Sequence, residues 1–501
     1  MIIKVRFLDI GTEPMVLVNE QDAMKIGAKD NDRVRVDGKK TAIALLTVSD
    51  IVCAGEALLI GDLKKKIGAS DGDKLNIIYA SSPESVRSIR KKMDNEKLSK
   101  EEIHAIVIDI LENRLSKIEI SAWLTALYIN GMDIEEIADF TEAMVNTGDR
   151  VEFDRTPVYD FHSMGGVPGN KITPIVVSIV AAAGLMLPKT SSRAISSACG
   201  TSDFVETFCD IEMDAATLKR ISEDVGGVLA WGGAMNLAPV DDMVIKVEHP
   251  LGINPRAQML ASIMSKKMAI GATHLVIDIP MGSGTKVPSI EVARAYARDF
   301  MDLGEKLHIH TECAITYAEQ PVGSAIGPKL EARECIRILE GWKHPSSVIE
   351  KACDIAGMIL EMGGIANGSD KAREILESGA ALKKFREIVA AQNGNYDIKS
   401  TDLEPGEFKA EVISLTSGYV HSISNKDLVS IAKAAGAPSD KGAGLLVLKK
   451  KGQRVEKGET VLEIYGDNKA KVDRAKELAA KYKPFEIEGM LLKKIAAPRT
   501  R

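Results

Sequence analysis

The sequence predicts a multidomain α/β protein, and three observations carry this prediction. Its 501 residues are enough for three or four domains of about 100–200 residues each. Apolar residues alternate with polar ones near both ends of the chain, as they do in half-buried strands. Between residues 151 and 404, short apolar runs alternate with helical periodicity, which is typical of a mixed or parallel sheet flanked by helices.

Residues 1–83 predict a β-rich N-terminal domain. Ile3, Val5 and Phe7 lie two residues apart, the spacing that places side chains on one face of a strand. Turn signals such as Asp37-Gly38 separate these apolar runs from one another.

Residues 84–150 predict a helical domain, which we expect residues 237–270 to join. Ser99 and Glu102 have the spacing of a capping box, which marks the start of a helix. Trp123 lies in a second helix, and Asp133 starts a third. Three amphipathic helices with short links leave an apolar stripe outside, so we expect a homodimer or a larger homo-oligomer.

The strands and helices expected in residues 151–404 alternate along the chain. The apolar run 172–187 is too short to span a bilayer, and we interpret it as a buried core helix. The expected strands are residues 156–161, 227–231, 274–279 and 306–314. The expected helices include residues 172–183, 214–224, 288–303 and 372–392.

Residues 405–501 predict a β-rich C-terminal domain. From Lys451 onwards it resembles the half-barrel of biotinyl and lipoyl carrier domains, with Lys469 near the position that is modified in them. Residues 471–481 have a helical pattern, whereas a carrier needs a returning strand there. We therefore interpret the half-barrel as a scaffold, and a lipoyl-type carrier or binding protein is a distant alternative.

Composition and charge exclude several classes of protein. Lys and Arg number 65 against 71 Asp and Glu, and aromatic residues make up only 4%, so we expect neither nucleic acid nor a membrane as a partner. The six cysteines include no Cys-x-x-Cys pair, and the N-terminus has no apolar signal segment, which favours a cytoplasmic location. His308 and His310 lack further ligands at a recognisable spacing, so no metal site is expected.

The densest motif is a glycine-rich turn over residues 160–171. Gly165 and Gly166 let backbone N–H groups converge on an anion, and a helix follows. Ser163 adds a hydroxyl group and Lys171 adds a cation. The simpler alternative is a tight turn between a strand and a helix that binds nothing.

Three further segments carry groups suited to phosphate or sugar oxygens. Residues 190–206 combine many hydroxyl groups with Arg193, whose guanidinium can form two hydrogen bonds to phosphate. Ser262 and Lys266 lie four residues apart and share a helix face. Lys286 ends another glycine-rich loop. The simpler interpretations are solvated loops and exposed lysines.

The order of these motifs resembles the thymidine and pyrimidine nucleoside phosphorylase family. Residues 162–167 are similar to its phosphate loop, and residues 191–206 to its signature. The N-terminal domain, residues 168–171 and Lys286 resemble the archaeal branch, which acts on AMP. The resemblance implies phosphorolysis of nucleoside 5′-monophosphates to base and ribose 1,5-bisphosphate, with CMP and UMP as further substrates. Inorganic phosphate would be the co-substrate, and no cofactor is implied.

The resemblance also implies roles for particular residues. Those expected to hold phosphate are Ser163, Gly165, Lys171 and Ser191. Those expected to hold the nucleotide are Gly166, Ser192, Arg193, Ala194, Ile195, Ser196, Ser197, Thr201, Ser262, Lys266 and Lys286.

The sequence departs from this family at two positions. Asn254 stands where the archaeal branch has an aspartate that donates a proton, which an amide cannot do. Other candidates for the proton are His162 and the carboxyl groups of Asp241 and Asp242. Phe161 replaces a lysine of many relatives, and we expect Lys171 to supply the lost positive charge.

Two other activities stay open at this point. A thymidine or pyrimidine nucleoside phosphorylase would carry the same signature. An anthranilate-type phosphoribosyltransferase shares the architecture, but it needs Mg²⁺ and carboxylates for pyrophosphate, and the glycine-rich loops contain no such acidic cluster.

Overall fold

The computed structural model describes residues 1–10, 14–194 and 197–490. The chain divides into two compact units. The first consists of Met1–Gly148 and Ala238–Ser265, and the second of Asp149–Leu237 and the chain from Lys266 onwards.

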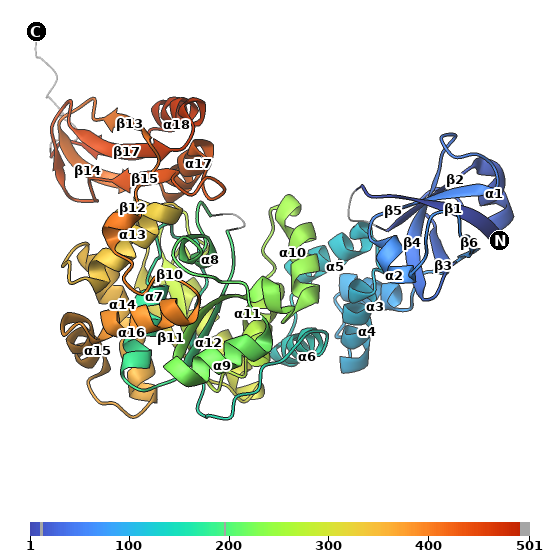
Figure 1. Ribbon diagram of the computed structural model, residues 1–501, viewed down its shortest axis with the longest axis horizontal. Helices are drawn as coiled ribbons and strands as arrows, with labels where there is room; N and C mark the ends of the chain where they lie inside the picture. The colour runs from blue at the N-terminus through green and yellow to red at the C-terminus, as the bar shows by residue number, and fades with distance from the viewer. Residues whose placement is uncertain (11–13, 195–196, 491–501) are drawn as a thin grey trace, which may run out of the picture. The chain divides into compact units, whose positions relative to one another are not determined.

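The first unit begins with a closed barrel whose strands follow the order β1-β5-β2-β4-β3-β6 (Figure 1). Alternate residues such as Val5, Val34 and Val36 are fully buried inside it, because successive side chains of a strand point to opposite faces. The strands are β1 (Ile2–Leu8), β2 (Met15–Val18), β3 (Arg33–Asp37), β4 (Thr41–Val48), β5 (Glu56–Ile60) and β6 (Lys74–Tyr79). Two short helices, α1 (Glu20–Ile26) and α2 (Leu63–Ile67), lie between strands of the barrel in the sequence.

A helical bundle makes up the rest of the first unit. The sequence predicted three helices in residues 84–150, but the structure has four, because residues 85–93 also form a helix. The capping boxes of Ser99 with Glu102 and of Asp133 with Glu136 start two of them. The helices are α3 (Ser85–Met93), α4 (Lys100–Leu111), α5 (Lys117–Asn130), α6 (Ile134–Val145), α10 (Pro239–Leu251) and α11 (Arg256–Ala269), the last of which continues into the second unit.

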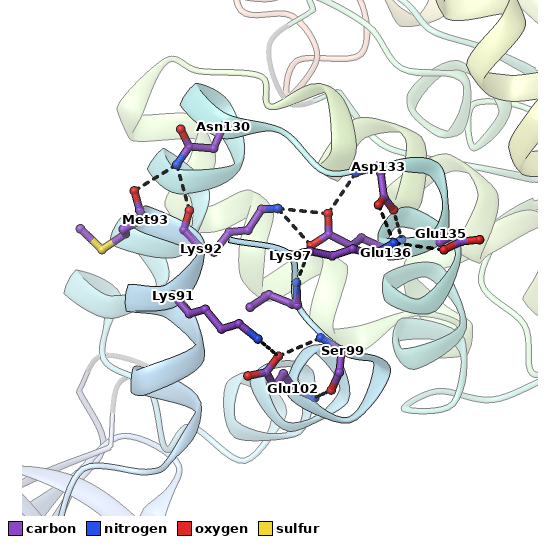
Figure 2. Close-up of polar contacts among 11 residues, drawn as sticks. Lys91, Lys92, Met93, Lys97, Ser99, Glu102, Asn130, Asp133, Glu135 and Glu136 are labelled. Atoms are coloured by element: carbon purple, nitrogen blue, oxygen red, sulfur yellow. Dashed lines mark hydrogen bonds and ion pairs between the residues drawn. The ribbon is translucent and has the colours of Figure 1, made fainter. Parts of the chain in front are cut away.

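A buried ion pair ties the bundle together (Figure 2). The Lys92 ammonium lies 3.0 Å from Glu136 Oε1, and both side chains are at most 4% exposed. The same carboxylate accepts hydrogen bonds from the backbone N–H groups of Leu98 and Asp133. Asn130 donates to the carbonyl oxygen of Lys92 and so covers the end of α3. The charges of this pair are therefore matched by polar partners inside the bundle.

The second unit contains a three-stranded parallel sheet in the order β11-β10-β7. Ser163, the last residue of β7, lies opposite Asp278 of β10, so the ends of these strands bring polar side chains together. A separate parallel pair joins β8 to β9. The strands are β7 (Tyr159–Ser163), β8 (Leu187–Ser191), β9 (Gly227–Trp231), β10 (His274–Met281) and β11 (His310–Tyr317).

Helices pack around these strands, and α7 forms the centre of the core. Residues 173–181 of α7 are all buried, which agrees with the core helix expected there. None of the described helices is both long and apolar enough to cross a membrane. The helices are α7 (Thr173–Ala182), α8 (Thr201–Val205), α9 (Ala215–Val225), α12 (Ile290–Lys306), α13 (Pro328–Leu339), α14 (Ser346–Met362), α15 (Gly368–Glu377) and α16 (Ala380–Ala391). Two 3₁₀ turns, Gly232–Met235 and Ser400–Asp402, accompany them.

Two expectations for this part of the chain were wrong. Residues 372–392 form parts of two helices, because Gly379 adopts a left-handed conformation with φ of 81° and ends the first. The strand expected over residues 306–314 begins only at His310, since α12 continues to Lys306. His308 lies in the turn between them with φ of 58°, so His308 and His310 do not share a strand face.

The C-terminal part contains two small antiparallel sheets. The first has the order β12-β15-β17-β13 and the second β16-β14-β18. The elements are β12 (Ala325–Ile326), β13 (Phe408–Ile413), β14 (Gly418–Ile423), α17 (Asn425–Ala435), β15 (Gly444–Val447), β16 (Arg454–Val455), β17 (Thr460–Gly466), α18 (Lys469–Tyr482) and β18 (Phe485–Glu488). Lys469 opens α18, so a helix stands where a carrier domain would need the returning strand.

Candidate active site

The glycine-rich loop after β7 meets the glycine-rich loop after β10. Gly165 and Gly166 both have a positive φ, of 76° and 90°, which permits the sharp turn at the strand end. A Cβ atom on Gly166 would lie 3.2 Å from the backbone nitrogen of Lys286, so a larger residue would crowd this contact. The structure therefore brings together two segments that are more than a hundred residues apart in the sequence.

Ser163 sits at the start of the first loop with a half-buried side chain. Its Oγ atom accepts a hydrogen bond from the backbone N–H of Gly165 at 3.3 Å and another from Asn170 Nδ2 at 3.2 Å. The loop backbone is also fixed to the sheet, because the Met164 N–H donates to the carbonyl oxygen of Asp278. Two hydrogen bonds to its Oγ atom and the backbone bond of the neighbouring Met164 thus hold Ser163 in place.

Four lysines act on the charge of His162. Burial lowers its pKa well below the ordinary value, and the charges of Lys267, Lys189, Lys266 and Lys286 lower it further. The imidazolium form is therefore disfavoured near pH 7, which makes His162 a poor source of a proton for a leaving base. The same lysines make this end of the sheet attractive to an anion.

Two of these lysines share one buried carboxylate, a feature that the sequence reasoning missed. The Lys267 ammonium donates to Asp160 Oδ2 at 2.6 Å, and the Lys189 ammonium lies 3.4 Å from Asp160 Oδ1. All three residues are at most 4% exposed. Burial lowers the pKa of Lys189 to about 7. The available signal was Phe161, because the Lys189 ammonium lies 5.0 Å from the centre of its ring.

Lys171 does not lie where the sequence placed it, and the expected phosphate contact was wrong. Its ammonium donates to Glu334 Oε2 at 2.6 Å and to the carbonyl oxygen of Val322 at 2.9 Å. The side chain is completely buried. A cation that is enclosed and paired in this way holds the loop to its neighbours instead of facing a ligand.

The segment after β8 is a closed loop built around Asp203. Its Oδ2 atom accepts hydrogen bonds from the backbone N–H groups of Ala194 at 2.7 Å and Gly200 at 2.8 Å. The backbone N–H of Ser202 donates to the carbonyl oxygen of Ser192. Ser191 ends β8 and Thr201 begins α8, one on each side of the loop. Ile195 and Ser196 lie outside the described residues, and Ser197 donates to the carbonyl oxygen of Cys199.

Arg193 in this loop is already paired. Its guanidinium donates to Glu206 at 2.5 Å and to Glu212 at 3.3 Å, and it stacks 4.8 Å from the centre of the Trp231 ring. The side chain is 34% exposed. Its charge is thus largely balanced by carboxylates, and the arrangement fixes the loop backbone.

Asn254, Ser262, Asp241 and Asp242 belong to the first unit, whereas the other site residues named from the sequence, Lys266 included, belong to the second. Asn254 is exposed in the short connection between α10 and α11. Ser262 donates to Asp241 Oδ2 at 2.8 Å, and Gln258 donates to Asp241 Oδ1 at 3.0 Å. Asp241 is completely buried, so it orients Ser262 and is poorly placed to reach a substrate.

No group of three or more His, Cys, Asp and Glu side chains within residues 1–10, 14–194 and 197–490 is arranged to hold a metal ion. His308 and His310 line a cavity of about 330 Å³ beside α12, together with Met301 and Thr311.

Family models match three parts of the chain. Residues 86–148 match the helical bundle domain of a glycosyl transferase family, and residues 155–382 match the α/β domain of the same family. Residues 419–485 match the C-terminal domain of pyrimidine nucleoside phosphorylases. Among solved structures, anthranilate phosphoribosyltransferase from Thermus thermophilus is similar, with a TM-score of 0.51, 20% identity, and coverage of 61% of this chain and 99% of that one. At this identity the likeness shows a shared fold only.

Curated relatives match over almost the whole length. An AMP phosphorylase from Thermococcus kodakarensis is 48% identical over 98% of this chain and 99% of its own. One from Methanococcoides burtonii is 47% identical over 96% of both chains, and AMP phosphorylase 1 from Archaeoglobus fulgidus is 48% identical over 95% of both. The order of the glycine-rich loops, the domain matches and this full-length similarity agree: the chain belongs to the AMP phosphorylase family.

Proposed function

We propose that the protein catalyses phosphorolysis of AMP, and of CMP and UMP, giving the free base and ribose 1,5-bisphosphate. Relatives named AMP phosphorylase align with at least 95% of the chain. One structural observation carries the proposal. The loops after β7 and β10 meet at Gly166 and Lys286, and Lys189, Lys266 and Lys267 add positive charge beside His162. A dianionic co-substrate needs such a site.

The phosphate subsite is proposed at the end of β7 and β8. Ser163 supplies a hydroxyl group, Gly165 supplies the turn of positive φ whose N–H supports that hydroxyl group, and Ser191 supplies a second hydroxyl group. Lys171 is not proposed as a cation of this subsite, since its buried ammonium is paired with Glu334. No cofactor takes part in the proposed reaction.

The nucleotide subsite is proposed around Lys286 and the loop after β8. Asp203 and Arg193 fix the described residues on either side of positions 195 and 196, so the polar groups there are positioned before a substrate arrives. The 5′-phosphate adds negative charge to the substrate, and Lys286 and Lys266 are the proposed cations for it. The residues proposed to hold the nucleotide are Gly166, Ser192, Arg193, Ala194, Ile195, Ser196, Ser197, Thr201, Ser262, Lys266 and Lys286.

The proposed chemistry is a single displacement at the anomeric carbon. An oxygen of phosphate forms a bond to C1′ while the bond from C1′ to the base nitrogen breaks, and its electron pair leaves with the base. Positive charge develops on the sugar, so a fixed phosphate dianion next to C1′ stabilises the transition state. Positioning of the two reactants is the main task of the protein.

The leaving base gains negative charge and takes up a proton. We propose that Asn254 donates a hydrogen bond to the base, because its amide has N–H groups but no acidic proton. His162 is set aside as the proton source because burial and four lysines keep its pKa well below the ordinary value. The proton then comes from solvent.

The test is an assay of the purified protein with AMP, CMP or UMP and inorganic phosphate. The expected products are the free base and a ribose that carries two phosphoryl groups, both resolved by chromatography and mass spectrometry. Thymidine and uridine serve as the comparison substrates. Turnover of these nucleosides without turnover of AMP would replace the proposal with a pyrimidine nucleoside phosphorylase.

We also propose a cytoplasmic homodimer or larger homo-oligomer. Helix α5 exposes Ile118, Tyr128 and Ile129, with exposed fractions of 80%, 58% and 72%. Apolar side chains gathered on one helix are typical of a covered surface. Light scattering on the full chain and on an Ile118→Glu, Ile129→Glu variant tests this, because the variant should then dissociate.

A further inference from the structure

We propose that Asn170 is a positioning residue that turns the hydroxyl hydrogen of Ser163 towards the attacking phosphate. This inference rests on the proposed function and deepens it, since it concerns the same phosphate subsite. It assigns a role to a side chain for which the sequence analysis gave none.

The first step concerns the hydrogen bonds that Ser163 receives. A serine hydroxyl group has one hydrogen to donate and two lone pairs that accept. Both lone pairs of Ser163 are used, by the Gly165 backbone N–H at 3.3 Å and by Asn170 Nδ2 at 3.2 Å. The hydroxyl hydrogen must then point in the remaining direction. Within the described part of the chain, no acceptor takes it.

The second step concerns the orientation of the Asn170 amide. Its Nδ2 group also donates to Asp278 Oδ2 at 3.3 Å. Asp278 is completely buried, with the Lys351 ammonium 2.8 Å from Oδ2 and the Thr316 hydroxyl donating to Oδ1 at 2.5 Å. A carboxylate held in this way only accepts hydrogen bonds, so the NH₂ side of the amide must face it. The same NH₂ group therefore faces Ser163 as a donor.

The third step concerns the oxygen of the same amide. Asn170 Oδ1 is buried and lacks a hydrogen-bond partner among the described residues. A buried acceptor without a partner lowers stability. The side chain of Asn170 therefore lowers stability at its Oδ1 atom. We attribute its role to the hydrogen bond from its Nδ2 group to Ser163.

The consequence is that Ser163 acts as a donor only. Phosphate oxygens accept hydrogen bonds, so a hydroxyl group whose hydrogen is already directed outward binds them without reorganisation. Without Asn170, the Ser163 hydroxyl group would rotate freely among several partners, and part of this advantage would be lost.

The test compares inorganic phosphate binding in the wild type, Asn170→Ala, Ser163→Ala and the double variant, with the full-length protein in titration calorimetry. We expect Asn170→Ala to weaken phosphate binding about tenfold, the effect of losing about 1.4 kcal/mol. In the Ser163→Ala background, the same change should have no further effect, because Asn170 acts through Ser163. Steady-state assays should show a higher KM for phosphate and an unchanged KM for AMP.

A matched control is Asn425→Ala. Asn425 is also a buried asparagine whose Nδ2 group is bonded, to the Ala318 carbonyl oxygen, and whose Oδ1 atom has no described partner. This variant should lose stability in urea without a change in phosphate affinity. If Asn170→Ala does not fold, Asn170→Asp keeps the shape and replaces the donor with an acceptor, which should weaken phosphate binding at least as much.

Two outcomes overturn the inference: unchanged phosphate affinity in the folded Asn170 variants, or losses from Asn170→Ala and Ser163→Ala that simply multiply in the double variant. The binding experiment does not depend on turnover. A wild type that binds phosphate with the expected differences between variants, but does not split AMP, therefore overturns the proposed function alone.

Discussion

The Lys171 ammonium lies 2.6 Å from Glu334 Oε2, and this buried pair fastens the glycine-rich loop to α13. Glu334 also accepts hydrogen bonds from the backbone N–H groups of Ser324 and Ala325. Gly169 packs beside the pair, where a Cβ atom would lie 2.6 Å from the Val322 carbonyl oxygen. A lysine that a sequence motif presents as a phosphate ligand is thus part of the scaffold beneath the loop.

The first prediction is that Lys171→Met mainly lowers stability. Removing the ammonium leaves the Glu334 carboxylate buried without its charged partner, which costs about 3–5 kcal/mol of the free energy of unfolding. Urea denaturation measures this loss. Adding Glu334→Gln to the same chain should restore part of it. An unchanged unfolding midpoint together with a weaker affinity for phosphate would return Lys171 to the phosphate site.

The second prediction concerns Lys189 and pH. Burial lowers its pKa to about 7, from 10.5 for an unhindered lysine. Between these two values the unfolded chain binds a proton that the folded chain does not bind, so stability rises with pH in this window. We expect the wild type to gain stability between pH 7 and 10 relative to Lys189→Met, which lacks this titration.

Urea denaturation of both proteins at pH 7, 8.5 and 10 checks this. Asp160 and Lys267 remain in both proteins, and His162 titrates below this range because its pKa is lowered. Parallel stability curves for the two proteins would mean that Lys189 keeps its proton throughout.

The sequence predicted much of the fold because local signals agreed with the packing. The alternation around Val34 and Val36 matches the barrel interior, and the capping box at Ser99 and the cap at Asp133 start the helices that they predicted. The failures lie where one residue decides between two structures. Gly379 ends a helix within a run that is periodic on both sides, and the prediction followed the periodicity across it.

The site was harder to predict because its charges are arranged by long-range contacts. Lys171 and Lys189 are both lysines next to candidate loops, yet one faces Glu334 and the other Asp160. Only the register of β7 against β10 shows that Asp278 lies beside Ser163, and hence that Asn170 can bridge them. A sequence motif identifies the loop, but it cannot tell which polar side chains of the loop are used internally.

The third prediction compares two lysine contacts in the helical bundle (Figure 2). Lys92→Met removes the partner of the buried Glu136 carboxylate and should cost about 3–5 kcal/mol of the free energy of unfolding. Lys97 pairs with Asp133 and Glu135 at the surface, where it is 55% exposed. Lys97→Met should leave the stability nearly unchanged because solvent already screens its charge. Similar losses in both variants would contradict this distinction.

The fourth prediction concerns Asn254, which occupies the position where the archaeal branch of the family is expected to have an aspartate. An amide can donate a hydrogen bond to the leaving base but cannot transfer a proton. Asn254→Asp introduces a group that can, and general acid catalysis contributes about 10²–10⁴-fold in favourable cases. We expect kcat for AMP to rise about tenfold or more, and most strongly at low pH, where more of the carboxyl group is protonated.

Single-turnover assays with AMP between pH 5 and 8 measure this, with Asn254→Ala as the control that offers the base neither a hydrogen bond nor a proton. The exposure of Asn254 between α10 and α11 means that neither change leaves a buried group unpaired, so both variants should fold. If Asn254→Asp is slower than the wild type at every pH, the amide hydrogen bond to the base matters more than a proton at this position. The enzyme would then have exchanged a general acid for a donor that works at any pH, because an amide does not titrate in this range.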